Sequence, residues 1–186
     1  MLNRDNALAI VHTYIKNDNL VKHMLAVESV MRYYAEIEGE DIEKWAVTGL
    51  LHDFDWEIHP TAEEHPQAGA AILRQHGVDE EIIRAVLSHG NNTGISRETR
   101  MEKALAACDE ITGLIIAVAL VRPSRSLLDL EVSSVKKKWK DRAFAAGANR
   151  EEIEEMTADF GLDLWEHVGN AITAMRRIAP QLGLAG

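Results

Sequence analysis

His52 and Asp53 stand side by side at the end of an apolar stretch that covers residues 45–51. Such a stretch is expected in the protein interior, where an imidazole and a carboxylate without partners are costly to bury. A divalent cation can satisfy both side chains at once through their lone pairs. A hydrogen bond between the two side chains, or a cap at a helix end, would also satisfy them. The dipeptide alone therefore leaves these interpretations open.

Four further residues are candidate metal ligands. His23 lies upstream in an apolar segment, Asp109 lies at the head of another, and His65 and His89 fall between His52 and Asp109. A mixed set of imidazoles and carboxylates suits Mn, Fe, Co, Ni or Zn better than calcium, which prefers oxygen ligands. The helix predicted before His52 would also direct the negative end of its dipole toward that residue, which favours a cation by about 0.3–1 kcal/mol.

The order of these residues, H…HD…D, resembles that of the HD superfamily of metal-dependent hydrolases. The resemblance covers about residues 20–115. It implies an all-helical scaffold on which His23, His52, Asp53 and Asp109 ligate one divalent metal ion. The stretch 136–147 also resembles a segment of a smaller group of uncharacterised, predicted HD-type hydrolases, whose substrates the resemblance does not imply.

His65 and His89 occupy the interval in which two-metal members of this superfamily place histidines for a second ion. The resemblance therefore implies a dinuclear centre in which Asp53 bridges the two ions, and in which Asp53, His65 and His89 take part in catalysis. The alternative is a single ion, with one or both histidines acting as a general acid or base or contacting a phosphate. The sequence thus predicts one or two divalent transition-metal ions.

The elements that must position these residues are predicted to be helices throughout. We expect an all-α, single-domain helical bundle of the HD-domain type over residues 1–186, with a metal-binding core at about 20–115 and C-terminal helices 131–178 packed on it. The helical periodicity and the capping residues set the element boundaries. The predicted helices are one over residues 7–15, one ending at Gly39, one from Glu40 or Asp41 to His52, one ending at Gly77, one from Asp79 to His89, one from Ser96 or Arg97 to Pro123, and two near 131–145 and 150–178.

Composition fits a globular enzyme in a reducing compartment. Cys108 is the single cysteine of the 186 residues, so no disulfide can form within the chain, and the residue is expected to be a small buried side chain. The N-terminus does not have the pattern of a signal peptide. The longest apolar run, 111–121, is expected to be a helix buried on all sides and is shorter than the roughly 20 residues that cross a bilayer. We therefore predict a cytoplasmic protein without a membrane partner.

The charge is uneven along an acidic chain of net charge −10, since residues 122–142 contain seven basic and three acidic side chains. This composition does not offer the broad basic face that duplex nucleic acid requires. It is enough for a small phosphorylated molecule, for which Arg122, Arg125 and Lys137 are the candidate phosphate-binding residues. The alternative is a solvated helix face on which lysines balance neighbouring acids.

The most consistent function is a metal-dependent phosphohydrolase, either a phosphomonoesterase or a phosphodiesterase, that acts on a small phosphorylated or nucleotide-type substrate through attack of an activated water. Asp55, Glu57 and Glu110 are candidates for orienting that water or serving as base. Two alternatives stay open: a di-iron oxygenase on the same scaffold, and a catalytically silent metal or nucleotide sensor. The apolar C-terminal helices also leave a homodimer open.

Overall fold

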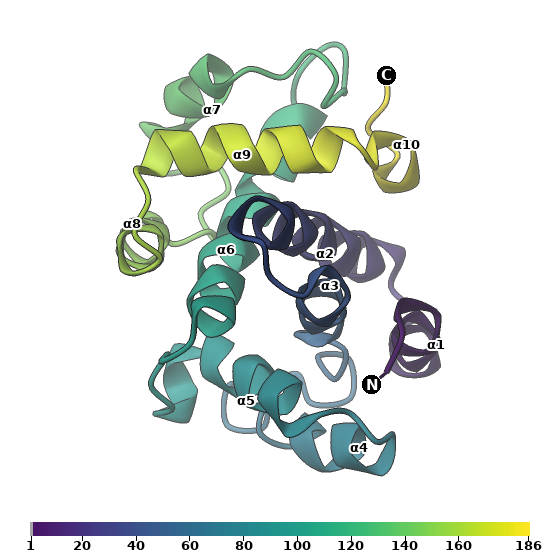
Figure 1. Cartoon of the computed structure of the whole chain (residues 1–186). Coiled ribbons are helices and arrows are strands. Elements are labelled where there is room, and N and C mark those ends of the chain that lie inside the picture. Colours follow the sequence, from purple (N-terminus) through teal and green to yellow (C-terminus); the bar gives the residue numbers. More distant parts are fainter. Residues whose placement is uncertain (1) are drawn as a thin grey trace. The chain divides into compact units, whose positions relative to one another are not determined.

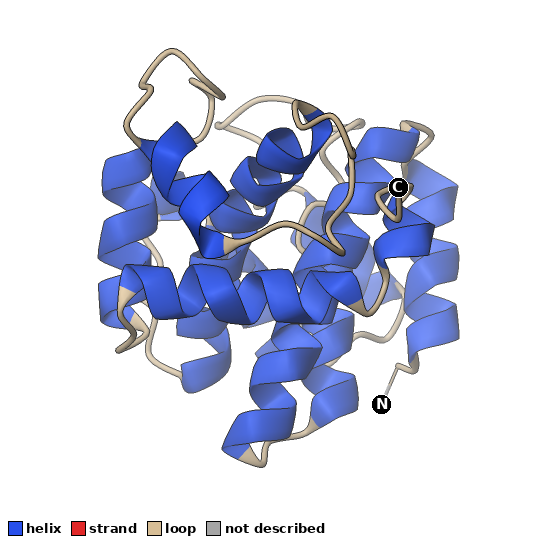
Figure 2. Cartoon of the chain, turned by 90° about the horizontal axis from the view of Figure 1, so that it is seen from above, coloured by secondary structure: helices blue, strands red, loops and turns tan. Residues whose placement is uncertain are grey.

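The computed structural model describes residues 2–186, and within them the chain forms ten α-helices and one short 3-10 helix, without a named strand (Figures 1 and 2). The prediction of an all-α protein is confirmed. No helix among the described residues is long and apolar enough to cross a membrane.

The contacts between residues divide the chain into two compact units, Met1–Ala106 and Ala107–Gly186. That residues 1–186 act as a single domain stays a prediction.

The first unit is built around α3, a short helix that packs against three others (Figure 1). Its close approach to α2 depends on Gly49, because a Cβ at this position would lie 3.0 Å from the backbone N and Cα of Glu28. Leu50 on α3 and Phe54 in the turns that follow it are buried in one apolar core. The helices of this unit are α1 (Arg4–Tyr14), α2 (Asp18–Glu38), α3 (Ile42–Leu51), α4 (Gly69–Gln75), α5 (Glu80–His89), the 3-10 helix η1 (Asn91–Thr93) and the start of α6 (Arg100–Leu120).

Local capping signals place the ends of α2 and α3 where the sequence predicts them. Gly39 ends α2 in the left-handed region, with φ +74°. Asp41 caps the start of α3 by accepting a hydrogen bond from the backbone N–H of Lys44. His52 is the C-terminal cap residue of α3, so the helix delivers it and the following Asp53 to the point at which the helix ends.

The long helix α6 starts later than predicted, at Arg100 and not at Ser96 or Arg97. A capping box fixes this start. The Thr99 hydroxyl accepts the backbone N–H of Glu102, and the buried Glu102 carboxylate accepts the backbone N–H of Thr99 in return. The helix ends at Leu120, before Pro123. Residues 100–106 of α6 belong to the first unit and residues 107–120 to the second.

Two predicted helices of the second unit differ from those in the structure. The helix expected over 131–145 ends at Trp139, and residues 142–147 form turns. The helix expected over 150–178 is divided, because Gly161 takes φ +84° and Asp163 caps a new helix by accepting two backbone N–H groups. The elements here are the rest of α6, α7 (Val132–Trp139), α8 (Arg150–Asp159), α9 (Leu164–Arg176) and α10 (Ala179–Leu182).

The prediction that the apolar run 111–121 is buried on all sides is wrong. The run is buried on one side only. Ile111 and Leu114 are fully buried, whereas Leu120 is 43% and Val121 56% exposed. Cys108, three residues before this run, is fully buried, and burial raises the pKa of its thiol well above the usual value. The thiol is therefore an apolar packing group and is poorly suited to be a nucleophile.

Candidate metal centre

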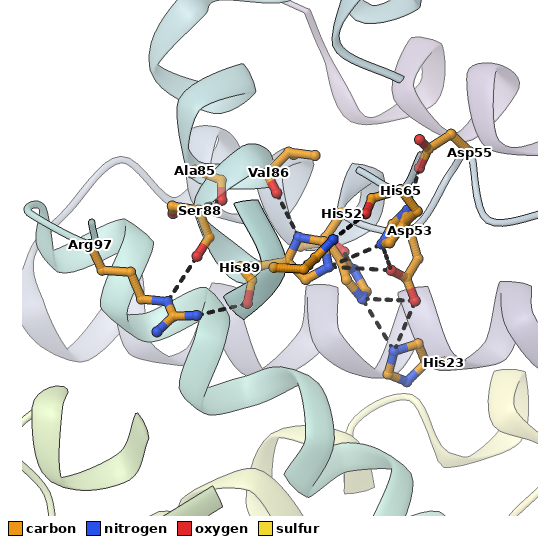
Figure 3. A network of polar contacts seen from close by, with 12 residues as sticks. His23, His52, Asp53, Asp55, His65, Ala85, Val86, Ser88, His89 and Arg97 are labelled. Carbon is orange, nitrogen blue, oxygen red and sulfur yellow. Dashed lines mark hydrogen bonds and ion pairs between the residues drawn. The ribbon is translucent and has the colours of Figure 1, made fainter. Parts of the chain in front are cut away.

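Five of the predicted ligands meet inside the first unit, although they come from four separate segments (Figure 3). They are His23 on α2, His52 and Asp53 at the end of α3, His65 in the turns that precede α4, and His89 at the last position of α5. Three of the four histidines are buried or nearly so, and their rings point toward the carboxylate of Asp53 (Figure 3).

The two carboxylate oxygens of Asp53 face two different pairs of histidines. Its Oδ2 lies 3.4 Å from Nε2 of His52 and 3.6 Å from Nε2 of His23. Its Oδ1 lies 3.1 Å from Nε2 of His65 and 3.5 Å from Nε2 of His89. One carboxylate is therefore shared between two pairs of imidazole nitrogens, an arrangement that could hold one or two metal ions.

The opposite ring nitrogens of three histidines are held by acceptor oxygens. Nδ1 of His52 lies 2.8 Å from the carbonyl oxygen of Gly49, and Nδ1 of His89 lies 2.5 Å from that of Val86. Nδ1 of His65 lies 2.8 Å from Oδ1 of the buried Asp55. Because these oxygens accept hydrogen bonds, the three Nδ1 atoms donate, and in the neutral rings the remaining ring lone pair lies on Nε2.

The distance between facing nitrogens tests whether a metal fits. Nε2 of His65 and Nε2 of His89 are 3.3 Å apart, and Nε2 of His23 and Nε2 of His52 are 3.2 Å apart. Two neutral Nε2 lone pairs at this distance repel each other unless a cation lies between them. A ring proton can relieve one contact, and a metal ion can relieve it while using both lone pairs. The groups therefore suit a transition metal with nitrogen and oxygen ligands.

The charged groups of the cluster influence one another's pKa values. Burial alone would raise the pKa of Asp53, but the charge of His52 and hydrogen bonds from the surrounding histidines hold it well below its usual value. Burial would lower the pKa of His65, but hydrogen bonds and charge from Asp53 and Asp55 raise it to about 9. The cluster thus binds protons where a metal would bind, and a metal must compete with them.

Several residues that support the ligands were not found from the sequence. The guanidinium of Arg97 donates to the carbonyl oxygens of Ser88 and His89 and so holds the end of α5 (Figure 3). The side-chain amide of Asn92 donates to the carbonyl oxygen of His65 at 3.0 Å. Both belong to the polar loop that follows His89, and such a loop gives no local signal for a contact with His65, 27 residues earlier.

Gly69 makes room for the buried carboxylate of Asp55. A Cβ at position 69 would lie 2.5 Å from Oδ2 of Asp55, so any other residue would displace that side chain. Oδ2 is itself a buried atom without a hydrogen-bond partner among the described residues. The other oxygen, Oδ1, binds His65. This makes Asp55 a positioning residue for His65, while its predicted role as a base stays a prediction.

The other candidate acids differ in their surroundings. Glu57 accepts hydrogen bonds from the backbone N–H groups of Lys16 and Asn17 at 2.9 and 2.6 Å, which ties the segment after Asp53 to the start of α2. Glu110 lies on α6 in the second unit, as does Asp109, whose backbone carbonyl accepts a hydrogen bond from the hydroxyl of Thr112. The ligand role of Asp109 stays a prediction.

The three candidate phosphate-binding residues also lie in the second unit. Arg122 is already engaged, since its guanidinium donates to both carboxylate oxygens of Asp129 at 2.7 and 3.1 Å and to the carbonyl oxygen of Ser126. Arg125 is exposed in the loop after α6, with φ +46°, and Lys137 is exposed on α7. The phosphate-binding role of all three stays a prediction, and Arg122 would have to leave Asp129 to fulfil it.

Comparison with known proteins identifies the class. The HD domain family matches residues 20–119, more than half of the chain, so the protein belongs to the HD-domain family. It is 27% identical to Ribonuclease Y of Pseudothermotoga lettingae over 151 residues and 29% identical to Ribonuclease Y of Thermosipho melanesiensis over 161 residues. In both cases the match covers 76% of this chain and 30% of the relative. No solved structure matches the chain.

Membership in this family confirms the resemblance that the H…HD…D order indicated. It places the chain in a superfamily of metal-dependent phosphohydrolases, and the histidine and aspartate cluster of the first unit is able to hold a metal ion. The chain spans about 30% of the length of the two relatives described above. Their activity as whole proteins therefore bears on this chain only as a proposal.

Proposed function

We propose that this protein is a dinuclear metal-dependent phosphohydrolase that acts on a small phosphorylated or nucleotide-type substrate. His23, His52, Asp53 and Asp109 would hold one ion, and Asp53, His65 and His89 would hold the second. Asp109 enters this set from the order of the residues in the sequence. The other five ligands are supported by their convergence in the first unit.

The observation that carries the proposal is the position of Asp53 between two pairs of histidines. A structural His–Asp pair needs one imidazole, whereas here four Nε2 atoms lie 3.1–3.6 Å from the oxygens of one carboxylate. Three of these histidines are also fixed through Nδ1. Nitrogen ligands whose outer nitrogens are held in this way keep their lone pairs directed inward.

The protein's residues bind and orient, and the metal supplies the chemistry of activation. A bound divalent ion lowers the pKa of water and stabilises negative charge on a phosphoryl oxygen. Asp53 offers one oxygen to each half of the cluster, and Asp55 keeps the Nε2 atom of His65 directed at it. Asp55 is fully buried and contacts His65, so in this proposal it positions His65.

The relatives favour a phosphodiester among the substrates. Their name, Ribonuclease Y, describes enzymes that cleave RNA. A phosphodiester and a phosphomonoester both place negative charge on phosphoryl oxygens, so the same ligand set serves either reaction. We therefore include short single-stranded oligonucleotides beside mononucleotides as test substrates.

The test combines metal analysis with activity. The protein, purified without chelator, is analysed by mass spectrometry for metals and assayed with p-nitrophenyl phosphate, bis-p-nitrophenyl phosphate, mononucleotides and a short oligonucleotide. We expect about two equivalents of metal and phosphate-ester hydrolysis, both lost in His52→Ala. His12→Ala, which removes an exposed histidine of α1, is the matched control and should leave both unchanged.

Three results would contradict the proposal in different ways. Absence of metal after reconstitution would overturn the centre itself. Two equivalents of iron with oxygen consumption and no ester hydrolysis would instead establish the di-iron oxygenase. Bound metal without turnover of any of these substrates would favour the silent sensor.

A further inference from the structure

Helix α7 and its C-terminal cap residue carry a group of lysines. Lys136, Lys137 and Lys140 are exposed and Lys138 is half-buried. Among the residues that the structure describes, none of these four forms an ion pair, whereas most arginines of this acidic protein do. Lys138 lies over the ring of Phe144, and the positive charges of Lys136, Lys137 and Lys140 repel one another, so an anion bound there would relieve that repulsion.

Two tryptophans form a wall next to these lysines. The indole rings of Trp139 on α7 and Trp165 on α9 contact each other edge to face, with centroids 5.6 Å apart. Trp139 is held by the buried Arg150, whose guanidinium lies over its ring and donates hydrogen bonds to three backbone carbonyls. Trp165 is half-buried and keeps part of its surface accessible.

Three of these lysines, Lys136, Lys137 and Lys140, line one pocket of about 500 Å³ in the second unit together with both tryptophans. Its walls contain no acidic side chain; they are Ser133, Lys136, Lys137, Trp139, Lys140 and Trp165. The ammonium group of Lys136 lies 4.9 Å from the ring centroid of Trp165, so positive charge and aromatic surface occur at the same place. A pocket of this volume accommodates a ligand of nucleotide size.

We propose that this pocket, which we call the Trp–Lys pocket, binds single-stranded nucleic acid. A base stacks on the accessible indole of Trp165, and the adjoining phosphates contact Lys137 and Lys140. Stacking platforms beside positive charges are the general means by which proteins hold single strands without reading their sequence. The site is formed by the second unit alone and does not depend on the metal centre or on the proposed hydrolase activity.

Charge and size together favour this ligand over others. An acidic peptide would use the lysines and leave the indole unused. Duplex nucleic acid hides the base faces, and neutralising its backbone requires a broader basic surface than one pocket. A single strand offers both a planar aromatic face and phosphates that follow it at short distance. It matches both features of the pocket at once.

The test measures binding of a fluorescent deoxythymidine strand of about ten nucleotides by anisotropy, over a range of salt concentrations. The full-length protein with its bound metal is used, and Asp53→Asn is measured in parallel to remove binding at the metal centre. Lys137→Gln/Lys140→Gln tests the phosphate contacts, and Trp165→Leu against Trp165→Phe tests stacking. Lys16→Gln/Arg74→Gln removes the same charge from exposed positions of the first unit and is the matched control.

We expect the strand to bind both wild type and Asp53→Asn. Trp165→Leu should weaken binding about tenfold and Trp165→Phe much less. Lys137→Gln/Lys140→Gln should lower the magnitude of the slope of log K against log salt concentration by about 0.7 for each lost phosphate contact.

Equal binding by all variants would overturn the proposal, as would an equal loss of binding in the control pair. Competition by poly-glutamate or duplex DNA as strong as that by unlabelled strand would also overturn it. If Trp165→Leu does not fold, the lysine pair and the competition experiments still decide.

Discussion

Two buried histidines, one in each compact unit, behave in opposite ways. His65 in the first unit lies beside Asp53 and Asp55, and their hydrogen bonds and charges raise its pKa to about 9 against the effect of burial. His167 in the second unit lies with Nε2 2.8 Å from the carbonyl oxygen of Ala107. There burial dominates and lowers its pKa to about 4.

The difference shows what turns a buried histidine into a site. Burial by itself favours the neutral ring, which then serves as a packing and hydrogen-bonding group. Carboxylates directed at the ring nitrogens favour a cation at the same place, and that cation can be a proton or a metal ion. A histidine in an apolar helix such as α9 is therefore no sign of function until its neighbours are known.

The largest expected effect comes from removing the shared carboxylate of the first unit. Asp53→Asn leaves four imidazoles without the negative charge that their Nε2 atoms face. We expect metal to be lost from both halves and hydrolysis to fall by more than about 100-fold, above the range usual for outer-shell changes. Mass spectrometry of metals and the ester assays measure this. Retention of one equivalent of metal would show that the halves do not depend on a common ligand.

Removing His65 should affect one half only. Its ring contacts Oδ1 of Asp53, whereas His23 and His52 face Oδ2. We expect His65→Ala to lower the metal content from about two equivalents to about one. An unchanged content would rule out a second ion at His65 and make it an acid–base or phosphate-contacting residue. His167→Ala removes the buried histidine of the second unit and should retain the full metal content.

The two histidines should also give opposite pH dependences of stability in metal-free protein. The unfolded state protonates His167 near pH 6.5 and the folded state only near pH 4. The free energy of unfolding should therefore fall by up to about 3 kcal/mol as the pH drops through this interval. The raised pKa of His65 contributes stability below pH 6.5 that is lost as the pH rises through about 9.

Urea unfolding with chelator present, followed across the pH range, measures both contributions. His167→Gln should flatten the acidic limb and His65→Gln the alkaline limb. An acidic limb that is identical in wild type and His167→Gln would show that His167 does not stay neutral in the folded protein. The comparison between the two histidines would then fail.

A smaller effect is expected from the residue that orients His65. Asp55→Ala removes the acceptor of its Nδ1–H and should lower metal affinity or activity by about 10–100-fold. Asp55→Asn retains an acceptor oxygen and should lose less. Gly69→Ala should act in the same direction, because its Cβ would displace the Asp55 carboxylate. Wild-type metal affinity in Asp55→Ala would show that His65 needs no second partner.

Sequence patterns predicted the elements near the metal centre better than those farther along the chain. Gly39 and Asp41 act within one or two turns, so the ends of α2 and α3 follow from local chemistry. The predicted start of α6 was wrong because Thr99 and Glu102 form a capping box. This capping box excludes the earlier polar residues from the helix. The division between α8 and α9 was missed because the apolar periodicity continues across Gly161.

The sequence by itself determined the fold class, the family and the residue types that can bind metal, because these depend on periodicity and on the order of a few side chains. Tertiary structure decided which oxygen of Asp53 faces which pair of histidines, that Asp55 supports His65, and that two tryptophans on different helices line a pocket with the α7 lysines. These relations join residues that are distant along the chain, and packing of the helices alone brings them into contact.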